Sequence, residues 1–123
     1  MHAAAHFTDD AGDPVGPLTQ AYLSAMREQL GAIRRLLDLK RRLIALGNQV
    51  HDPASDAPAQ AQALMAELGT LAPEVTAATD RVGQSLQRAA RAWEQGTETE
   101  PSRERARLTA EFDQLVAAAE KDD

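Results

Sequence analysis

The chain has 123 residues, a net charge of −6, no cysteine and only four aromatic side chains. This length provides one domain, and the acidic balance disfavours general binding to nucleic acid or to acidic lipid. Without cysteine there is no disulfide framework, which fits a reducing compartment. The apolar residues are mostly Leu and Ala, which are strong helix formers. We therefore expect an all-α protein whose long, thin core leaves no slot for a bulky cofactor.

Residues 1–17 contain three Asp, two Pro and two Gly without any apolar period, which predicts a disordered, flexible arm. This segment also lacks the basic start and hydrophobic stretch of a signal peptide. No apolar run approaches the roughly 18–20 residues that span a bilayer. We interpret the chain as a cytoplasmic protein without an integral membrane segment, and its frequent Ala and Arg are typical of a bacterial genome.

Two neighbouring rows of aliphatic residues follow residues 18–51 at spacings of three and four. Consecutive helical residues point about 100° apart, so two adjacent rows make one wide apolar face. Such a face contacts two neighbours, which predicts a three-helix bundle and not a two-stranded coiled coil. The rows are Leu23, Met26, Leu30, Ile33, Leu37 and Ile44, and Tyr22, Ala25, Ala32, Leu36, Leu39, Leu43, Leu46 and Val50.

A second helix is predicted over residues 59–95, after a loop with two Pro and two Asp in which Ser55 or Asp56 provides the cap. Its apolar repeat continues across Pro73, although an internal Pro loses a hydrogen bond and clashes with the preceding turn. Either the helix is kinked at Pro73 or it breaks there and a new segment begins. The register does not slip, which favours the kink.

The third helix is predicted over residues 101–120, with Thr97 and Glu100 forming a capping box at its start. Both connections are short, so the three helices should form one antiparallel, up-down-up bundle over residues 18–121. Trp93 should then return to the beginning of the first helix and pack near Leu18 and Tyr22.

Three passages resemble the N-terminal Habc bundle of the syntaxins, and together they cover nearly the whole helical part of the chain. The first is RRLLDLKRRLIALGNQ (34–49), where an apolar series runs into a basic stretch. The second is LMAELGTLAPEVTAATDRVGQSLQ (64–87), and the third is RERARLTAEFDQLV (103–116). The resemblance implies a regulatory bundle that folds against a helical partner. Because the printed sequence holds no heptad segment or membrane anchor after the bundle, we do not expect the membrane fusion activity of the family. The matching residues in the last two passages are Arg81, Val82, Leu86, Arg103, Arg105, Leu108, Thr109 and Phe112.

Candidate chemical sites are few. His2, His6 and His51 lie in the arm or at a helix end, and none has the Glu three residues away that bundle metal sites use. No phosphate loop, nucleophile elbow or thiol is present, so we expect neither an enzyme nor a metal or cofactor site. One basic block consists of Arg34, Arg35, Lys40, Arg41 and Arg42, and we expect it to be solvated or paired with the acidic third helix. Contact with an anionic ligand or lipid is the alternative.

The unequal helix lengths predict an interaction surface. At 1.5 Å per residue the first two helices span about 50 Å and the third about 30 Å. The third helix should therefore end near Leu39 to Leu43 and leave an apolar strip without a third wall, which is typical of a protein contact. A partner helix, a second copy of the chain, or the arm through Phe7 and Val15 are the candidates for covering it. The predicted strip consists of Leu43, Leu46, Val50, Leu64 and Met65.

Three functions fit this sequence. The first is a non-enzymatic, syntaxin-like interaction module that binds a helical segment of a partner protein. The second is a secretion or flagellar-export chaperone that holds a client helix, and the third is a structural subunit that forms homo-oligomers. A client gene next door would favour the chaperone, a downstream heptad segment would favour the syntaxin-like module, and a stable oligomer would favour the structural subunit.

Overall fold

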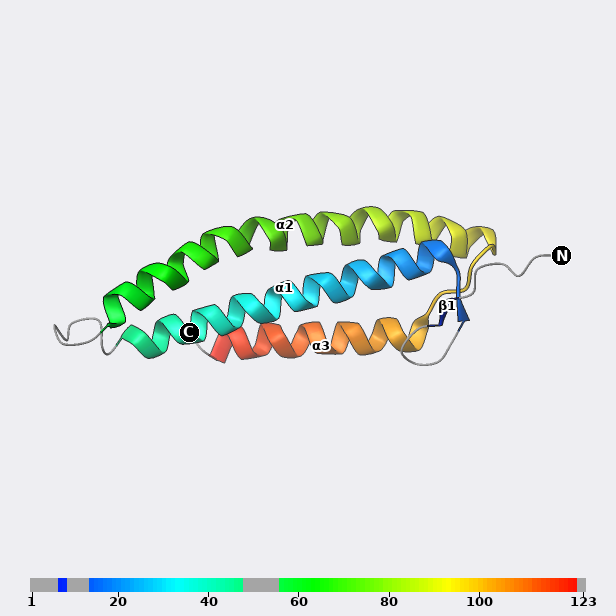
Figure 1. Cartoon of the computed structure of the whole chain (residues 1–123). Helices are drawn as coiled ribbons and strands as arrows, with labels where there is room; N and C mark the ends of the chain where they lie inside the picture. The colour runs from blue at the N-terminus through cyan, green and yellow to red at the C-terminus, as the bar shows by residue number, and fades with distance from the viewer. Residues whose placement is uncertain (1–6, 9–13, 48–55, 122–123) are drawn as a thin grey trace.

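The computed structural model describes residues 7–8, 14–47 and 56–121, and these residues form three helices and one minimal strand pair. The predicted all-α bundle of three long helices is confirmed (Figure 1). Most of the predicted arm, residues 1–6 and 9–13, lies outside the described residues. The elements are β1 (Phe7–Thr8), which pairs antiparallel with β2 (Pro14–Val15), then α1 (Pro17–Gly47), α2 (Ala57–Gln95) and α3 (Ser102–Lys121).

Helix α1 lies between the other two helices and contacts both, as its two apolar rows predict (Figure 1). Arg27 of α1 pairs with Glu104 of α3 at 3.3 Å. One heptad further along both helices, Arg34 pairs with Glu111 at 2.7 Å. Because residue numbers rise in the same direction along both helices, α1 and α3 are parallel. Helix α2 runs the opposite way, so the order is up-down-up.

The core has two parts that differ in the number of helices that build them. One part joins all three helices and includes β2, through the buried residues Val15, Tyr22, Leu23, Leu30, Ala89 and Leu108. The other part is a seam between α1 and α2 alone, with the buried residues Ala32, Leu39, Leu64 and Leu71. The bundle is therefore three helices thick where α3 is present and two helices thick beyond it (Figure 1).

Helix α2 is continuous through Pro73, as the unbroken register predicts, and the alternative of a break there is wrong. A proline at this position cannot donate to the carbonyl of Gly69, and its ring presses on that carbonyl. Gly69 and Pro73 are both exposed, so the disturbed turn faces water, which satisfies the freed carbonyl. The first half of α2 curves around α1 in Figure 1 and so keeps its apolar side on the seam.

Replacing Pro73 by Ala is expected to raise the free energy of unfolding by about 1–3 kcal/mol, because it restores one helical hydrogen bond and removes the ring clash. Urea unfolding followed by circular dichroism measures this change. Pro58→Ala is the matched control in the same helix: Pro58 lies in the first turn of α2, where a proline ring is tolerated, so no gain is expected. A loss of stability in Pro73→Ala would show instead that the bend is needed for the seam.

The aromatic end of the bundle closes as the sequence predicts. The rings of Trp93 and Tyr22 meet edge to face with centroids 5.9 Å apart. The indole N–H of Trp93 donates to the hydroxyl of the fully buried Thr19 at 2.9 Å. Arg105 of α3 lies over both rings and donates to the hydroxyl of Tyr22. Burial lowers the pKa of Arg105, but the Tyr22 and Glu100 oxygens outweigh it and the net shift is upward, so the guanidinium stays charged.

The loop between α2 and α3 caps other helices and not α3, so the predicted capping box is wrong. The hydroxyl of Thr97 donates to the carbonyl of Ala92 at the end of α2. The carboxylate of Glu98 accepts from the backbone N–H groups of Leu18 and Thr19, at 3.2 and 2.8 Å, and so caps the start of α1. A Cβ on Gly16 would collide with the side chain of Glu98, so the glycine makes room for this cap.

Candidate functional site

Helix α3 ends well before the other two helices (Figure 1). At 1.5 Å per residue, the 20 residues of α3 span about 30 Å, whereas the 39 residues of α2 span about 58 Å. Near the end of α3, the ammonium group of Lys40 donates to the carbonyl of Ala119 at 3.4 Å. The third helix therefore stops beside Lys40, within the predicted interval. We call the remaining part, residues 40–47 of α1 and 57–68 of α2, the open end.

Two large apolar side chains of the open end face solvent, with Ile44 51% and Met65 58% exposed. Ile44 follows Met26 by 18 residues, or five full turns, so both lie on the same face of α1. Met26 and Phe112 of α3 line the same crevice between the two helices. Ile44 therefore lies on the α3-facing side of α1, beyond the place where α3 ends. Ile44 is exposed because no third helix reaches it.

Met65 lies on the same side of the bundle as Ile44. It precedes Thr79 by two heptads, and the hydroxyl of Thr79 accepts a hydrogen bond from the side-chain amide of Gln29 at 3.1 Å. Gln29 in turn lines the crevice against α3 together with Met26 and Phe112. Met65 and Ile44 thus flank the path along which a longer α3 would continue.

The structure places the predicted strip residues in different environments. Leu43 and Leu46 are half-buried against the seam, and Leu64 is buried within it. Leu46 and Leu64 also line a concavity of about 430 Å³ between α1 and α2. Met65 is exposed, and Val50 lies outside the described residues. The predicted strip is therefore divided between leucines that belong to the seam and the exposed Met65. Ile44 is exposed as well, although the sequence pattern placed it in an apolar row without marking it as part of the site.

The segment before α1 does not cover the open end through Val15. Val15 is buried with Tyr22, Leu23 and Leu108 in the three-helix part of the core. The backbone of Phe7 pairs with that of Val15 in the short ladder, so Phe7 lies at the same end. Closure of the strip by Phe7 and Val15, one of the three alternatives, is therefore wrong: both are held at the opposite end of α1.

Much of the predicted basic block is used within the chain. Arg34 pairs with Glu111 of α3, and Arg35 pairs with Glu74 of α2 at 2.9 Å. Arg42 pairs with Asp38 one turn earlier at 3.1 Å. These pairs are exposed, so each contributes at most about 1 kcal/mol to stability. They favour the intramolecular interpretation of the block over an anion site.

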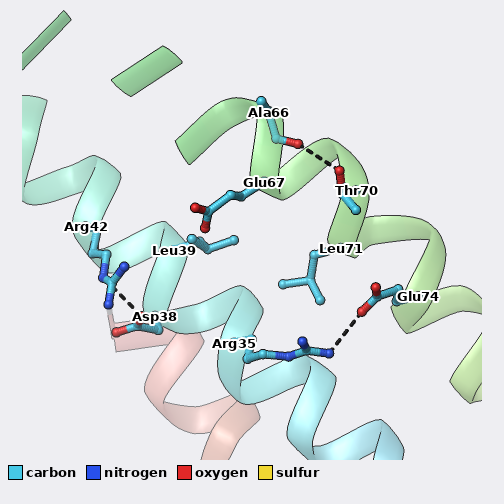
Figure 2. Close-up of a pocket in the computed structure, with 9 residues that line it drawn as sticks. All are labelled: Arg35, Asp38, Leu39, Arg42, Ala66, Glu67, Thr70, Leu71 and Glu74. Carbon is cyan, nitrogen blue, oxygen red and sulfur yellow. Dashed lines mark hydrogen bonds and ion pairs between the residues drawn. The ribbon is translucent and has the colours of Figure 1, made fainter. Parts of the chain in front are cut away.

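Figure 2 shows a concavity of about 480 Å³ over the middle of the seam. The buried side chains of Leu39 and Leu71 form its apolar floor. Above them, the Arg35–Glu74 pair bridges α1 and α2, while Glu67 points across the seam toward α1. The described lining residues include neither His nor Cys, and the Thr70 hydroxyl donates back to the carbonyl of Ala66. The concavity presents paired charges over an apolar floor.

Other kinds of site receive no support from the described part of the chain. No group of three or more His, Cys, Asp or Glu residues is placed to hold a metal ion there. The three histidines, His2, His6 and His51, lie outside the described residues. None of the helices α1, α2 and α3 combines the length and hydrophobicity that crossing a bilayer requires.

The fold and its surface define the chain as a three-helix bundle protein with one end open on the side of its short helix. No family model matches the sequence, and neither a curated protein nor a solved structure shows significant similarity to it.

Proposed function

We propose that this chain is a non-enzymatic, cytoplasmic protein-interaction module whose open end binds a helical segment of a partner protein. The observation that carries the proposal is the exposure of Ile44 and Met65, two large apolar side chains of the open end on the side where α3 stops. A soluble protein gains free energy by burying such side chains in a contact. An amphipathic helix would fit this surface, because the amphipathic helix α3 already packs on the same face of α1 along the rest of the bundle.

The resemblance of residues 34–49, 64–87 and 103–116 to the syntaxin Habc bundle supports the same role, since that domain is regulatory and folds against helical segments. The lack of cysteine suits the reducing cytoplasm, and the Ala- and Arg-rich composition suits a bacterial source. A secretion or flagellar-export chaperone would use the open end in the same way and would differ only in the identity of its client.

The double substitution Ile44→Ser with Met65→Ser tests the proposal. The full-length chain serves as bait in affinity capture from the cells that encode it, and the retained protein is then reconstituted with the purified chain. We expect the wild type to bind a helical segment of that protein and the double variant to lose at least tenfold in affinity, since two apolar anchors are removed. Leu18→Ser, which replaces an exposed Leu at the other end of α1, should bind like the wild type.

Two results would contradict the proposal. If sedimentation shows a wild-type dimer that the double variant converts to a monomer, the open end is a self-association surface of a structural subunit. If the double variant loses its cooperative thermal transition while Leu18→Ser keeps it, Ile44 and Met65 are part of the core and not a contact site.

A further inference from the structure

Helix α3 is held less firmly in the bundle than the other two helices. Eight side chains of α1 and six of α2 are buried, whereas those of α3 are Glu104 and Leu108 alone. The buried residues of α2 extend from Ala57 to Ala92, along nearly the whole helix. Both buried residues of α3 lie in its first two turns, and Val116 further along is 41% exposed. Burial of apolar surface therefore fixes α2 along its length and α3 only near its beginning.

After its second turn, α3 is held to α1 by contacts that water reaches. Phe112 and Leu115 are only partly buried where they pack against the three-helix part of the core. The side chains of the Arg34–Glu111 pair are 55% and 29% exposed, and Lys40 donates to a backbone carbonyl in the last turn of α3 at 3.4 Å. Exposed polar contacts of this kind contribute little to stability, because solvent and salt screen them.

The caps at this end of the α1–α2 hairpin do not depend on α3. The backbone N–H and the hydroxyl of Thr97 close the end of α2, and the carboxylate of Glu98 caps the start of α1. From Glu100 onward the chain is tied to α3 instead, since Glu100 pairs with Arg105 at 2.8 Å. The exposed Thr99 lies between these two parts of the loop. A rotation of the backbone at Thr99 therefore separates α3 from α1 and leaves both caps intact.

We infer that α3 is a reversible cover on α1, which opens as a unit about Thr99 while the hairpin of α1 and α2 stays folded. Opening bares the face of α1 that carries Met26, and this face continues to the exposed Ile44 beyond the end of α3. At 1.5 Å per residue it is about 27 Å long. The closed form predominates, because opening exposes the buried Leu108 and the partly buried Phe112 to water.

The opening of α3 goes beyond the proposed function and needs no partner. Proteins open locally in cooperative units, and elements with few buried contacts are the first to open. In the closed form α3 covers most of this face of α1 and leaves only the open end accessible. In the open form a helix of the partner can lie along the whole face, so α3 limits the length of helix that binds. Only this consequence rests on the proposed function.

Native-state hydrogen exchange of the full-length chain, followed by NMR in low concentrations of urea, tests the opening. The backbone amides of Leu108 and Phe112 report on α3, and those of Leu30 and Ala89 report on α1 and α2 around the same core cluster. We expect the α3 amides to exchange about a hundredfold faster than the Leu30 and Ala89 amides, relative to their intrinsic rates. Both α3 amides should share one urea dependence, less steep than that of global unfolding, because opening exposes less surface.

Two matched leucine substitutions sharpen the test, since both side chains are half-buried. Leu115→Ala weakens the packing of α3, which is lost in the open form and in the unfolded chain alike, so all four amides should exchange about five- to thirtyfold faster. Leu36→Ala weakens the seam, which persists in the open form. It should therefore speed exchange of the Leu30 and Ala89 amides by a similar factor and leave the α3 amides unchanged.

Three results overturn the inference. Equal protection of the four amides in the wild type shows that the bundle opens as one unit. Equal acceleration of all four amides by Leu36→Ala shows that α3 does not open independently of the seam. A steady fall in protection from Leu108 to Lys121, without a common urea dependence, shows that α3 frays from its end. None of these results affects helix binding at Ile44 and Met65, which the binding experiment on the double variant decides separately.

Discussion

Replacing Leu23 by Ala should lower the free energy of unfolding by about 3–5 kcal/mol, the range for a fully buried leucine whose surroundings cannot collapse into the cavity. Leu23 is 0% exposed and lies in the core cluster that joins α1, α2, α3 and β2. Small domains are stable by only about 5–15 kcal/mol, so this variant should lose much of its stability. Urea unfolding followed by the circular dichroism of the helices measures the loss.

Leu36→Ala is the matched control on the same helix, because Leu36 is only half-buried and packs in the two-helix seam. We expect it to cost about 1–2 kcal/mol, since less apolar surface is removed from a site that solvent already reaches. Equal costs for the two variants would show that the stability is spread evenly along α1 and does not depend on the three-helix part of the core.

The second large effect concerns Glu104, a carboxylate that is 0% exposed between α3 and α1. It accepts from the guanidinium groups of Arg27 and Arg107, whose side chains remain 31% and 47% exposed. Glu104→Ala removes the charge-assisted hydrogen bonds to Arg27 and Arg107 and leaves a cavity, so we expect a loss of about 2–4 kcal/mol. The loss does not reach the upper end for buried pairs, because both arginines can turn toward water.

Glu104→Leu separates the value of the charge from that of the packing. A leucine fills the same space without a desolvated charge, and the two arginines that lose this carboxylate are partly exposed, so they can turn toward water and are not left as buried charges. We expect Glu104→Leu to be within about 1 kcal/mol of the wild type. Glu111→Ala, at a 29% exposed carboxylate, should also cost no more than about 1 kcal/mol. A loss of several kcal/mol in Glu104→Leu would show that the ion pairs, and not the packing, hold α3 in place.

The architecture and much of the candidate site were predictable from the sequence. The two apolar rows on residues 18–51 predicted that α1 contacts two other helices, and α1 does contact both α2 and α3. The uninterrupted apolar repeat across Pro73 favoured a continuous α2, because a break would have shifted the register. The unequal lengths of the helices predicted where α3 ends, since the rise per residue is fixed. These properties depend on the spacing of residues along one chain, which is why the sequence determines them.

Tertiary structure decided the properties that depend on which distant groups meet. Glu98 caps α1, from which it is about 80 residues away, and the local spacing of Thr97 and Glu100 suggested a cap for α3 instead. From the sequence, Glu104 would be expected at the surface like the other carboxylates. In the structure it is buried against α1, where it pairs with Arg27. Ile44 belongs to an apolar row that is buried along α3 and exposed beyond it.

The sequence by itself therefore determined the number, the order and the apolar faces of the helices, because these follow from periodicity and chain length. Only the tertiary structure decided which charges are buried and which apolar side chains reach solvent. The burial of a side chain depends on the neighbours that surround it in space. If α3 ended one turn earlier or later, different residues of α1 and α2 would be exposed, although the sequence pattern of α1 and α2 would be the same.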